Sequence, residues 1–294
     1  VHFQDRLKDL PLDFYVLPGS LEKAKAQFAQ ARPMIEAFEH YFGEYPFGKD
    51  PNGHDWIYSS CEGPGAAVWW PNKDQWRDEV EQMDLSVAIP SDLVDVSNGK
   101  FAGKTDLGDG YTRWDWKIQY PINNYSVSIN AGKYVHFADR LGDLPLDFYV
   151  LPGSLEKAKA QFAQAKPMIE AFEHYFREYP FGRDRYKLME VLYGGMEDQS
   201  AVSYVNRFAS GYLERDWTGV GVSTKFDFII IHESAHEWFG NAVSAADVSD
   251  MWIQEGWATY LEAMYVEQLF GYEDALKYIN GYKSKVQNRQ PIIT

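Results

Sequence analysis

The apolar residues of the chain follow two different periods, and the first of them predicts a β region. Between residues 51 and 134 apolar and polar positions alternate, as they do in half-buried strands. The alternating positions form three runs: Leu85, Val87 and Ile89; Trp114, Trp116, Ile118 and Tyr120; Tyr125, Val127 and Ile129. Asn98-Gly99, Asp109-Gly110 and Asn123-Asn124 supply turns between such runs. We therefore expect an antiparallel sheet domain, or part of one, at 51–134.

A helical period takes over in the second half of the chain. After the N-cap candidate Ser154, apolar residues recur at steps of three and four, which places them on one face of a helix that Pro167 bends. These residues are Leu155, Ala158, Phe162, Ala165, Ile169, Phe172 and Phe176. Further on, the pattern predicts strands at 186–193 and 201–207 and helices at 226–241 and 250–285. The predicted fold class is α+β, a partial β domain followed by an α+β part.

A long internal repeat interrupts this order. Val1–Asp50 is nearly identical to Val135–Asp184. Only five of the 50 aligned pairs differ: Gln4/Ala138, Lys8/Gly142, Arg32/Lys166, Gly43/Arg177 and Lys49/Arg183. Each copy is mostly one helix and half a strand, too small to hold a core alone. The pattern favours a recent duplication, recombination or construction, the alternative being two copies of a working module.

The repeat suggests three parts: the duplicated helical segment at 1–50, the partial sheet domain at 51–134 and the α+β part at 135–294. The second copy is contiguous with the strand expected at Gly194-Gly195, so we expect it to occupy the native position. The first copy then packs on the exposed side of the sheet domain or exchanges into a partner chain, because identical elements swap at low cost. The duplicated segment is therefore a candidate for self-association.

The charge balance narrows the choice of partners. The chain has 43 acidic against 28 basic residues, a net charge of −15. This balance argues against nucleic acid and anionic membranes and suits ligands with a free amine. A single cysteine, Cys61, excludes an intrachain disulfide and a thiolate metal cluster. With no signal peptide and no apolar run near the ~18 residues of a membrane span, we expect a soluble protein whose compartment cannot be read.

The candidate chemistry lies at His232-Glu-Ser-Ala-His236. Two histidines four residues apart share one helical face and can bind one ion, and Glu233 lies beside the open position of that ion. Glu255, 19 residues after His236, can supply a third ligand from a second helix. Two imidazoles, a carboxylate and a water make a catalytic zinc site, so we expect one zinc per chain. The other histidines are expected at the surface or on helices (His2, His40, His136, His174) or in a loop (His54).

At this point the sequence resembles a known family. The spacing of the histidines and Glu255 is that of the gluzincins. The strings His232-Glu-Ser-Ala-His-Glu-Trp-Phe-Gly-Asn241 and Trp252-Ile-Gln-Glu-Gly-Trp-Ala-Thr-Tyr-Leu261 are similar to the aminopeptidase N and leukotriene-hydrolase family, peptidase family M1. Gly194-Gly-Met-Glu-Asp198 resembles that family's Gly-x-Met-Glu-Asn exopeptidase motif, with Asp198 in place of Asn. Ser59-Ser-Cys-Glu62 and Trp69-Trp-Pro71 are similar to its sheet-domain segment, so the resemblance covers most of residues 51–294.

The resemblance implies a thermolysin-like catalytic domain and an aminopeptidase mechanism. His232, His236 and Glu255 would hold zinc, and Glu233 would act as the general base. Glu197 and Glu62 would bind the α-ammonium of a peptide with a free N-terminus, since a buried ammonium needs carboxylate partners. The backbone of Gly195 and Met196 would bind the peptide edge, and Met196 would line the side-chain pocket.

Departures from the family pattern leave other functions open. The family's sheet domain is longer than the segment at 51–134, and in the family a helical domain follows the catalytic one. The family's transition-state tyrosine lies in a sequence setting that is not found between Glu255 and Thr294. On this basis the catalytic domain is expected to be C-terminally truncated and its activity low. The alternatives are a zinc-binding family fragment with little or no turnover, and a broader gluzincin endopeptidase.

Overall fold

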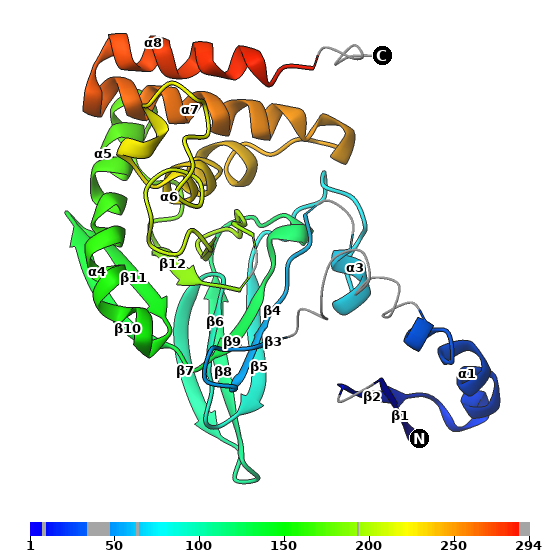
Figure 1. Ribbon diagram of the computed structural model, residues 1–294. Helices are drawn as coiled ribbons and strands as arrows, with labels where there is room; N and C mark the ends of the chain where they lie inside the picture. Colours follow the sequence, from blue (N-terminus) through cyan, green and yellow to red (C-terminus); the bar gives the residue numbers. More distant parts are fainter. Residues whose placement is uncertain (8–9, 34–47, 63–64, 193, 288–294) are drawn as a thin grey trace. The chain divides into compact units, whose positions relative to one another are not determined.

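A computed structural model of the chain describes residues 1–7, 10–33, 48–62, 65–192 and 194–287 (Figure 1). The chain divides into two compact units, Val1–Gly48 and Lys49–Thr294. Among the described residues no helix combines the length and the apolar character that crossing a membrane requires.

The first unit contains a β-hairpin and a helix. Strand β1 (His2–Leu7) pairs antiparallel with β2 (Leu10–Tyr15), and a short 3-10 turn at Pro18–Ser20 leads into α1 (Leu21–Phe28). Three aromatic rings join these elements: the Phe3–Phe14, Phe14–Phe28 and Phe3–Phe28 centroids lie 5.0, 5.1 and 6.2 Å apart.

Two antiparallel sheets form the β part of the second unit. One has the order β3 (Gly48–Lys49), β4 (Asp55–Tyr58), β9 (Ile129–Gly132) and β6 (Val94–Ser97). The other has the order β5 (Met83–Pro90), β8 (Tyr111–Ile118) and β7 (Lys100–Asp106). The short helix α3 spans Ala66–Trp69.

The alternation in the sequence located two of its three predicted strands. Strands β5 and β8 confirm the runs at Leu85–Ile89 and 114–118, and the predicted turn at Gly99 connects β6 to β7. The run beginning at Tyr125 was wrong at its start, because Asn124–Ser126 is a buried 3-10 turn whose Asn123 cap accepts the Tyr125 N–H at 3.4 Å. Only its last member, Ile129, lies on a strand, β9. The polar members of the run point into the protein instead of to solvent, so the alternation there does not mark two faces of a strand.

Residues 135–294 are built on a mixed sheet with the order β10 (Val135–Leu141), β11 (Leu144–Val150), β12 (Tyr186–Glu190) and β13 (Val202–Tyr204). β10 and β11 form an antiparallel hairpin, and the remaining pairs are parallel. The expectation of half a strand per copy was therefore wrong, since each copy begins with a complete hairpin.

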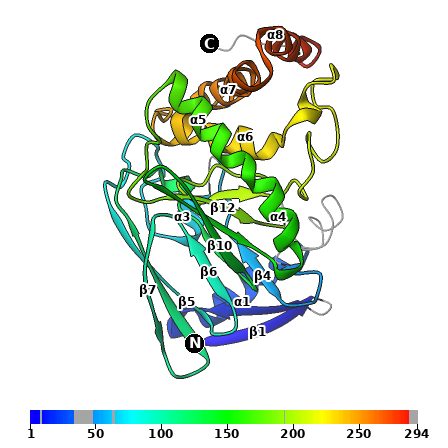
Figure 2. The ribbon, with the colours of Figure 1, turned by 90° about the vertical axis from the view of Figure 1, so that its left-hand side faces the viewer.

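Helices cover this sheet in Figures 1 and 2. α4 (Leu155–Gln161) and α5 (Ala165–Tyr175) run along it, separated by a 3-10 turn at Phe162–Gln164. Because Pro167 has no N–H for a helical bond to the carbonyl of Ala163, this break agrees with the predicted bend. α6 (Phe228–Ala235), α7 (Trp252–Phe270) and α8 (Tyr272–Gly281) lie in succession away from the sheet. The predicted helix at 250–285 is divided by Gly271, whose φ is +93°.

One hydrophobic core joins these layers. It contains side chains from β11, β12, α4–α5 and α6, among which Phe148, Phe162, Leu188 and Ile230 are at most 2% exposed. Further short helical turns occupy Ser223–Lys225, Val248–Asp250 and Tyr282–Ser284, and a wider turn follows α6 at Glu237–Asn241. The core therefore fixes α6, the helix that carries the two candidate histidines.

Candidate metal centre

Local sequence explains why α6 presents its histidines as a pair. The buried Asp227 side chain caps the helix by accepting the Ile230 N–H at 3.3 Å. The apolar residues that follow anchor the helix in the core, which leaves His232 and His236 on one face with their ring centroids 5.1 Å apart.

Each imidazole has one nitrogen held by an oxygen. His232 Nδ1 lies 2.6 Å from Glu262 Oε1, and His236 Nδ1 lies 3.0 Å from the carbonyl oxygen of Phe239. A carbonyl oxygen only accepts, so His236 Nδ1 carries the hydrogen and Nε2 keeps its lone pair. The same arrangement at His232 leaves both Nε2 atoms available to a metal.

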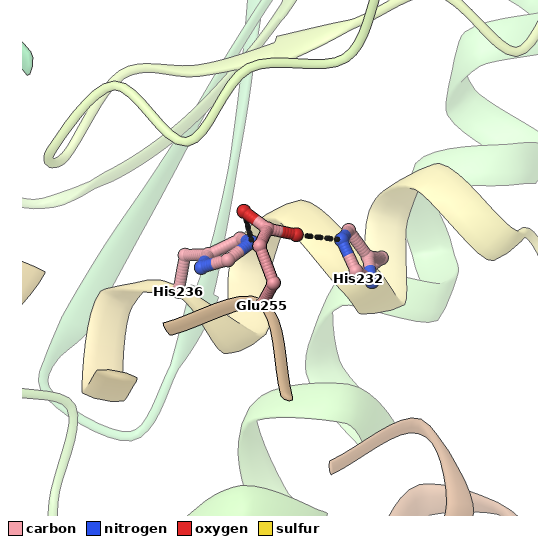
Figure 3. Close-up of side chains that lie close together, drawn as sticks. All are labelled: His232, His236 and Glu255. Atoms are coloured by element: carbon pink, nitrogen blue, oxygen red, sulfur yellow. Dashed lines mark ion pairs between the residues drawn. The ribbon is translucent and has the colours of Figure 1, made fainter. Parts of the chain in front are cut away.

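The third candidate ligand approaches from the first turn of α7. Glu255 Oε2 lies 3.5 Å from His232 Nε2, and Glu255 Oε1 lies 3.7 Å from His236 Nε2 (Figure 3). The three residues offer ligand atoms that all lie within 4.8 Å of one another. Two imidazoles and one carboxylate are the donor set of a catalytic zinc site, and the Glu255 side chain is 40% exposed, so this position is open to solvent.

Glu233 lies beside this group in a tightly packed position. It is 8% exposed, and Glu197, Glu233 and His236 form a second set of potential ligand atoms within 4.8 Å of one another. A Cβ on Gly195 would approach Glu233 Oε1 to 2.2 Å, so a side chain at this position would displace the carboxylate. Burial raises the pKa of Glu233 to about 8. The charge of His232 lowers this pKa, and the charges of the neighbouring carboxylates raise it further. A bound dication would favour the ionised form.

The predicted exopeptidase motif does not form a strand in the structure. Within 194–198, Met196 forms one isolated bridge, with its N–H and C=O both bonded to Ser203. The Met196 side chain is buried against Trp76, Tyr125 and Ala245. Bonding to Ser203 uses the backbone groups that Met196 was expected to offer a peptide, so Gly195 is the better candidate for that contact.

The two candidate amine-binding carboxylates come from different parts of the chain. Glu197 is 3% exposed, and its backbone carbonyl accepts the Asn241 side-chain amide at 2.8 Å. Glu62 is exposed and lies outside the helices and strands. Its pKa is raised, first by partial burial and then by the charges of Glu197 and Glu255, which places all three carboxylates in one electrostatic environment.

Asp198 stands where the family pattern has asparagine. It is fully buried and accepts the Ser203 hydroxyl at 3.2 Å. Burial, followed by the Glu197 charge, raises the pKa of Asp198 well above its ordinary value. A protonated carboxyl is uncharged like the amide it replaces.

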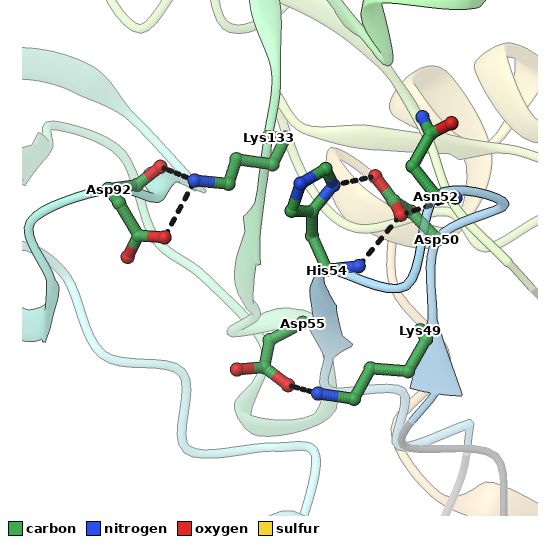
Figure 4. Close-up of polar contacts among 7 residues, drawn as sticks. All are labelled: Lys49, Asp50, Asn52, His54, Asp55, Asp92 and Lys133. Carbon is green, nitrogen blue, oxygen red and sulfur yellow. Dashed lines mark hydrogen bonds and ion pairs between the residues drawn. The ribbon is translucent and has the colours of Figure 1, made fainter.

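The other described histidines lie outside this group of ligand atoms. His54 is in a loop, as expected, and its ring lies 3.0 Å from Asp50 Oδ2 (Figure 4). His136 lies on β10 and pairs with Asp147, and His174 is exposed on α5. His2 is exposed on β1, and His40 lies outside the described residues.

The sequence did not single out Glu262, which positions His232. Glu262 is fully buried and accepts hydrogen bonds from Tyr278 at 2.6 Å and Tyr282 at 2.5 Å. A signal was present, because Glu262 follows Glu255 by seven residues and so lies two turns along the same face of α7. Sequence analysis also missed the roles of Tyr125 and Gln254. Tyr125 bonds to Glu197 and Gln254 bonds to Tyr125, and only the tertiary structure reveals these contacts.

The fold and the site together define a class. An α+β domain with His-Glu-x-x-His on a buried helix and a glutamate from the following helix is the architecture of a zinc metallopeptidase. Residues 160–291 match the model of the Peptidase family M1 domain. This segment contains all three candidate ligands, so the similarity to peptidase family M1 extends over the whole candidate metal centre.

Known proteins show the same similarity. "Probable aminopeptidase 2" of Sulfurisphaera tokodaii is 26% identical over 188 residues, covering 63% of this chain and 24% of that protein. Aminopeptidase Ey of Gallus gallus is 27% identical over 185 residues, covering 60% of this chain and 19% of that protein. The chain thus spans about a quarter or less of the length of these relatives.

The fold is shared with a solved structure. An M1 zinc metallopeptidase from Deinococcus radiodurans superposes with a TM-score of 0.68 at 19% identity, covering 85% of this chain and 54% of that one. The chain therefore shares its mixed α+β architecture with antiparallel sheets with that structure.

Proposed function

We propose that this chain is the catalytic part of a zinc-dependent aminopeptidase that hydrolyses the N-terminal peptide bond of peptides. The observation that supports the proposal most directly is the convergence of His232, His236 and Glu255 within 4.8 Å, next to Glu233. The three residues would hold one zinc ion. When bound there, zinc supplies a Lewis acid that polarises a carbonyl and lowers the pKa of a water.

Glu233 is proposed as the general base. Its carboxylate is confined between Gly195 and His236, which limits the rotamers it can adopt. From this position it would accept the proton of the attacking water and later deliver it to the nitrogen of the leaving amine. A confined base of this kind suits proton transfer because little reorientation is needed in each step.

Glu197 and Glu62 are proposed to bind the α-ammonium of the substrate. An ammonium leaves water only if carboxylates replace its hydration, and two acidic side chains from different segments provide such a site. Binding the amine here would place the first peptide bond at the metal. The names of the relatives, which are aminopeptidases, support this exopeptidase assignment over an endopeptidase.

Two alternatives make different predictions. A zinc-binding fragment with little or no turnover would take up metal but cleave neither kind of substrate. A broader endopeptidase would cleave substrates with a blocked amino terminus as readily as those with a free one. Both can be distinguished from the proposal by a single set of assays.

The test compares leucine p-nitroanilide with N-acetyl-leucine p-nitroanilide, with and without a chelator. The proposal expects cleavage of the free-amine substrate only, lost on chelation and restored by zinc. Glu233→Gln should reduce turnover by ~10²-fold or more at unchanged zinc content, because proton transfer is what it removes. Glu197→Gln should chiefly raise KM and blunt the preference for a free amine.

Metal analysis gives the control for the site itself. A His232→Ala/His236→Ala double variant should lose the zinc that the wild type retains after dialysis. Equal zinc content in the double variant and the wild type would refute the site, and equal cleavage of free and acetylated substrates would refute the aminopeptidase function.

A further inference from the structure

The hydroxyl group of Tyr125 lies between two polar side chains next to the candidate site. It donates to Glu197 Oε1 at 3.0 Å and accepts from Gln254 Nε2 at 2.9 Å. Gln254 Oε1 in turn accepts the backbone N–H of Ala245 at 3.0 Å. Tyr125, Gln254 and Glu197 are at most 3% exposed, so solvent offers these groups little competing hydrogen bonding.

This chain of hydrogen bonds has one direction. The Ala245 N–H requires the oxygen of the Gln254 amide, which turns the amide nitrogen toward Tyr125. Because an amide nitrogen only donates, the Tyr125 oxygen must accept there, and its single hydrogen is directed to Glu197. Burial, followed by the Glu197 charge, raises the pKa of Tyr125 well above its ordinary value, so the hydroxyl remains a donor.

The ring of Tyr125 is also fixed. It packs against Trp76 with the centroids 4.9 Å apart, in a small buried cluster that includes Met196. The hydroxyl therefore reaches Glu197 from a rigid platform. The bond to Oε1 therefore fixes the orientation of the Glu197 carboxylate, whose remaining lone pairs can accept from a ligand.

We propose that Tyr125 is a positioning residue that orients Glu197 for capture of the substrate α-ammonium. The inference rests on the proposed aminopeptidase function and adds to it a residue from the sheet part of the chain. Gln254 precedes the candidate ligand Glu255 on α7, so the same hydrogen bonds connect amine binding to the helix that completes the metal site. Tyr125 acts through Glu197 and does not itself contact the reacting atoms.

The test uses Tyr125→Phe with Tyr134→Phe as a matched control. Tyr134 is also a buried tyrosine, and its hydroxyl also has two partners: it accepts from Trp56 Nε1 at 2.8 Å and donates to the Glu190 carbonyl at 2.9 Å. Both variants keep the ring and lose one buried hydroxyl. A change seen only in Tyr125→Phe therefore reports on Glu197 and not on general destabilisation.

For leucine p-nitroanilide, Tyr125→Phe should raise KM about ten-fold while kcat stays within about three-fold, since ground-state binding of the amine is what weakens. The preference for free over acetylated substrate should fall by a similar factor, and zinc content should not change. Tyr134→Phe should match the wild type in KM and preference. Gln254→Met, which releases the Tyr125 hydroxyl from its donor, should shift KM in the same direction by a smaller factor.

The outcomes separate this inference from the function on which it rests. If the wild type prefers free amines and Tyr125→Phe retains the wild-type KM and preference, the positioning role is overturned and the aminopeptidase function stands. The same holds if Tyr134→Phe reproduces the KM change. If Tyr125→Phe does not fold, Gln254→Met decides, and a wild-type KM in that variant overturns the role. If the wild type shows no preference for a free amine, the proposed function and the role of Tyr125 fail together.

Discussion

The two copies of the repeated segment show one sequence in two surroundings. Each copy forms a hairpin, a 3-10 turn and a helix in the same order, β1–β2–α1 in the first and β10–β11–α4 in the second. The same three phenylalanines also meet in each: Phe137–Phe148, Phe148–Phe162 and Phe137–Phe162 centroids lie 4.9, 5.4 and 6.4 Å apart, close to the spacings in the first copy. The secondary structure and the contacts that depend only on residues within a copy are therefore the same in both copies.

Burial differs because it depends on partners outside the copy. Phe28 is 36% exposed, whereas its counterpart Phe162 is 1% exposed and also contacts Tyr204 and Phe208 at centroid distances of 4.8 and 5.6 Å. β11 continues into a sheet by pairing with β12, while in the described part of Val1–Gly48 β2 pairs with β1 alone. Local sequence thus specifies the elements, and β12, β13 and α6 turn one copy into part of a core.

The largest effect expected from this difference is in stability. Phe162→Ala should reduce the free energy of unfolding by about 3–5 kcal/mol, because it removes a fully packed ring. Phe28→Ala should cost less than about 1 kcal/mol in the same transition, since that ring is partly solvated and lies in the first unit. Urea unfolding followed by tryptophan fluorescence measures the second unit selectively, because all 10 tryptophans of the chain follow residue 49.

The Phe28 variant is the internal control for the Phe162 variant, since substitution and flanking sequence are the same. Equal losses for the two would mean that Phe28 contributes to the core of the second unit as much as Phe162 does. The comparison drawn from their exposure would then be wrong.

Deleting residues 1–48 sharpens the comparison at the level of the whole copy. The elements that hold α6 and α7 all lie in Lys49–Thr294, so zinc content and the kinetic constants should match those of the intact chain. We also propose that the first copy, having the sequence of an element that packs into a core, mediates self-association. Size-exclusion chromatography should then show a smaller species or a weaker concentration dependence after deletion.

Loss of zinc binding in the deleted chain would show that the first copy belongs to the catalytic core. An unchanged oligomeric state would remove the self-association proposal while leaving the site intact. The two readouts therefore test the two statements separately.

Sequence reasoning worked best where a pattern is local. The spacing of His232, His236 and Glu255 needs only one helix and the next, and the structure brings these residues together. The stripe from Leu155 and the strands β5 and β8 follow from periodicity in the same way. The prediction failed at Tyr125, where buried polar residues produce the same alternation as a strand. The Tyr125–Glu197 contact could not be predicted, because residues 72 positions apart meet only through the packing of two parts of the chain.

A smaller contrast between the copies concerns their last residue. Asp50 and Asp184 occupy equivalent positions, but their pKa values move in opposite directions. Burial of Asp50 is outweighed by hydrogen bonds from the His54 ring and from the N–H groups of His54 and Asn52, so its pKa is lowered from 3.8 (Figure 4). Burial of Asp184 prevails over the donors of Gln119, so its pKa is raised.

The signs of the stability changes follow from proton linkage. Folded Asp50 binds its proton less tightly than the unfolded chain, so its contribution is present above about pH 4 and lost as the pH falls through the folded pKa. Folded Asp184 binds its proton more tightly, so its contribution is lost as the pH rises from about 4 through the raised pKa. The free energy of unfolding is measured in urea from about pH 3 to pH 7. Asp50→Asn should abolish the part of this free energy that increases with pH, and Asp184→Asn should abolish the part that decreases with pH. Slopes that change in the same direction in both variants would contradict these assignments.

The smallest effect is expected where the two copies agree most closely. Lys166 Nζ lies 2.6 Å from Asp139 Oδ1, and at the equivalent positions Arg32 Nη1 lies 3.4 Å from Asp5 Oδ1. Both pairs lie within their own copy and are about equally exposed, with side chains between 36% and 47% accessible. An exposed ion pair contributes only ~0.2–1 kcal/mol and is weakened by salt, so a double-mutant cycle with Asp139→Asn and Lys166→Met should give a coupling in this range that declines in high salt. Lys166→Arg, which installs the residue of the first copy, should change stability by less than about 0.5 kcal/mol. A coupling well above this range, or one insensitive to salt, would show that the Lys166–Asp139 pair is protected from solvent. The surroundings of the two copies would then differ at the surface as well as in the core.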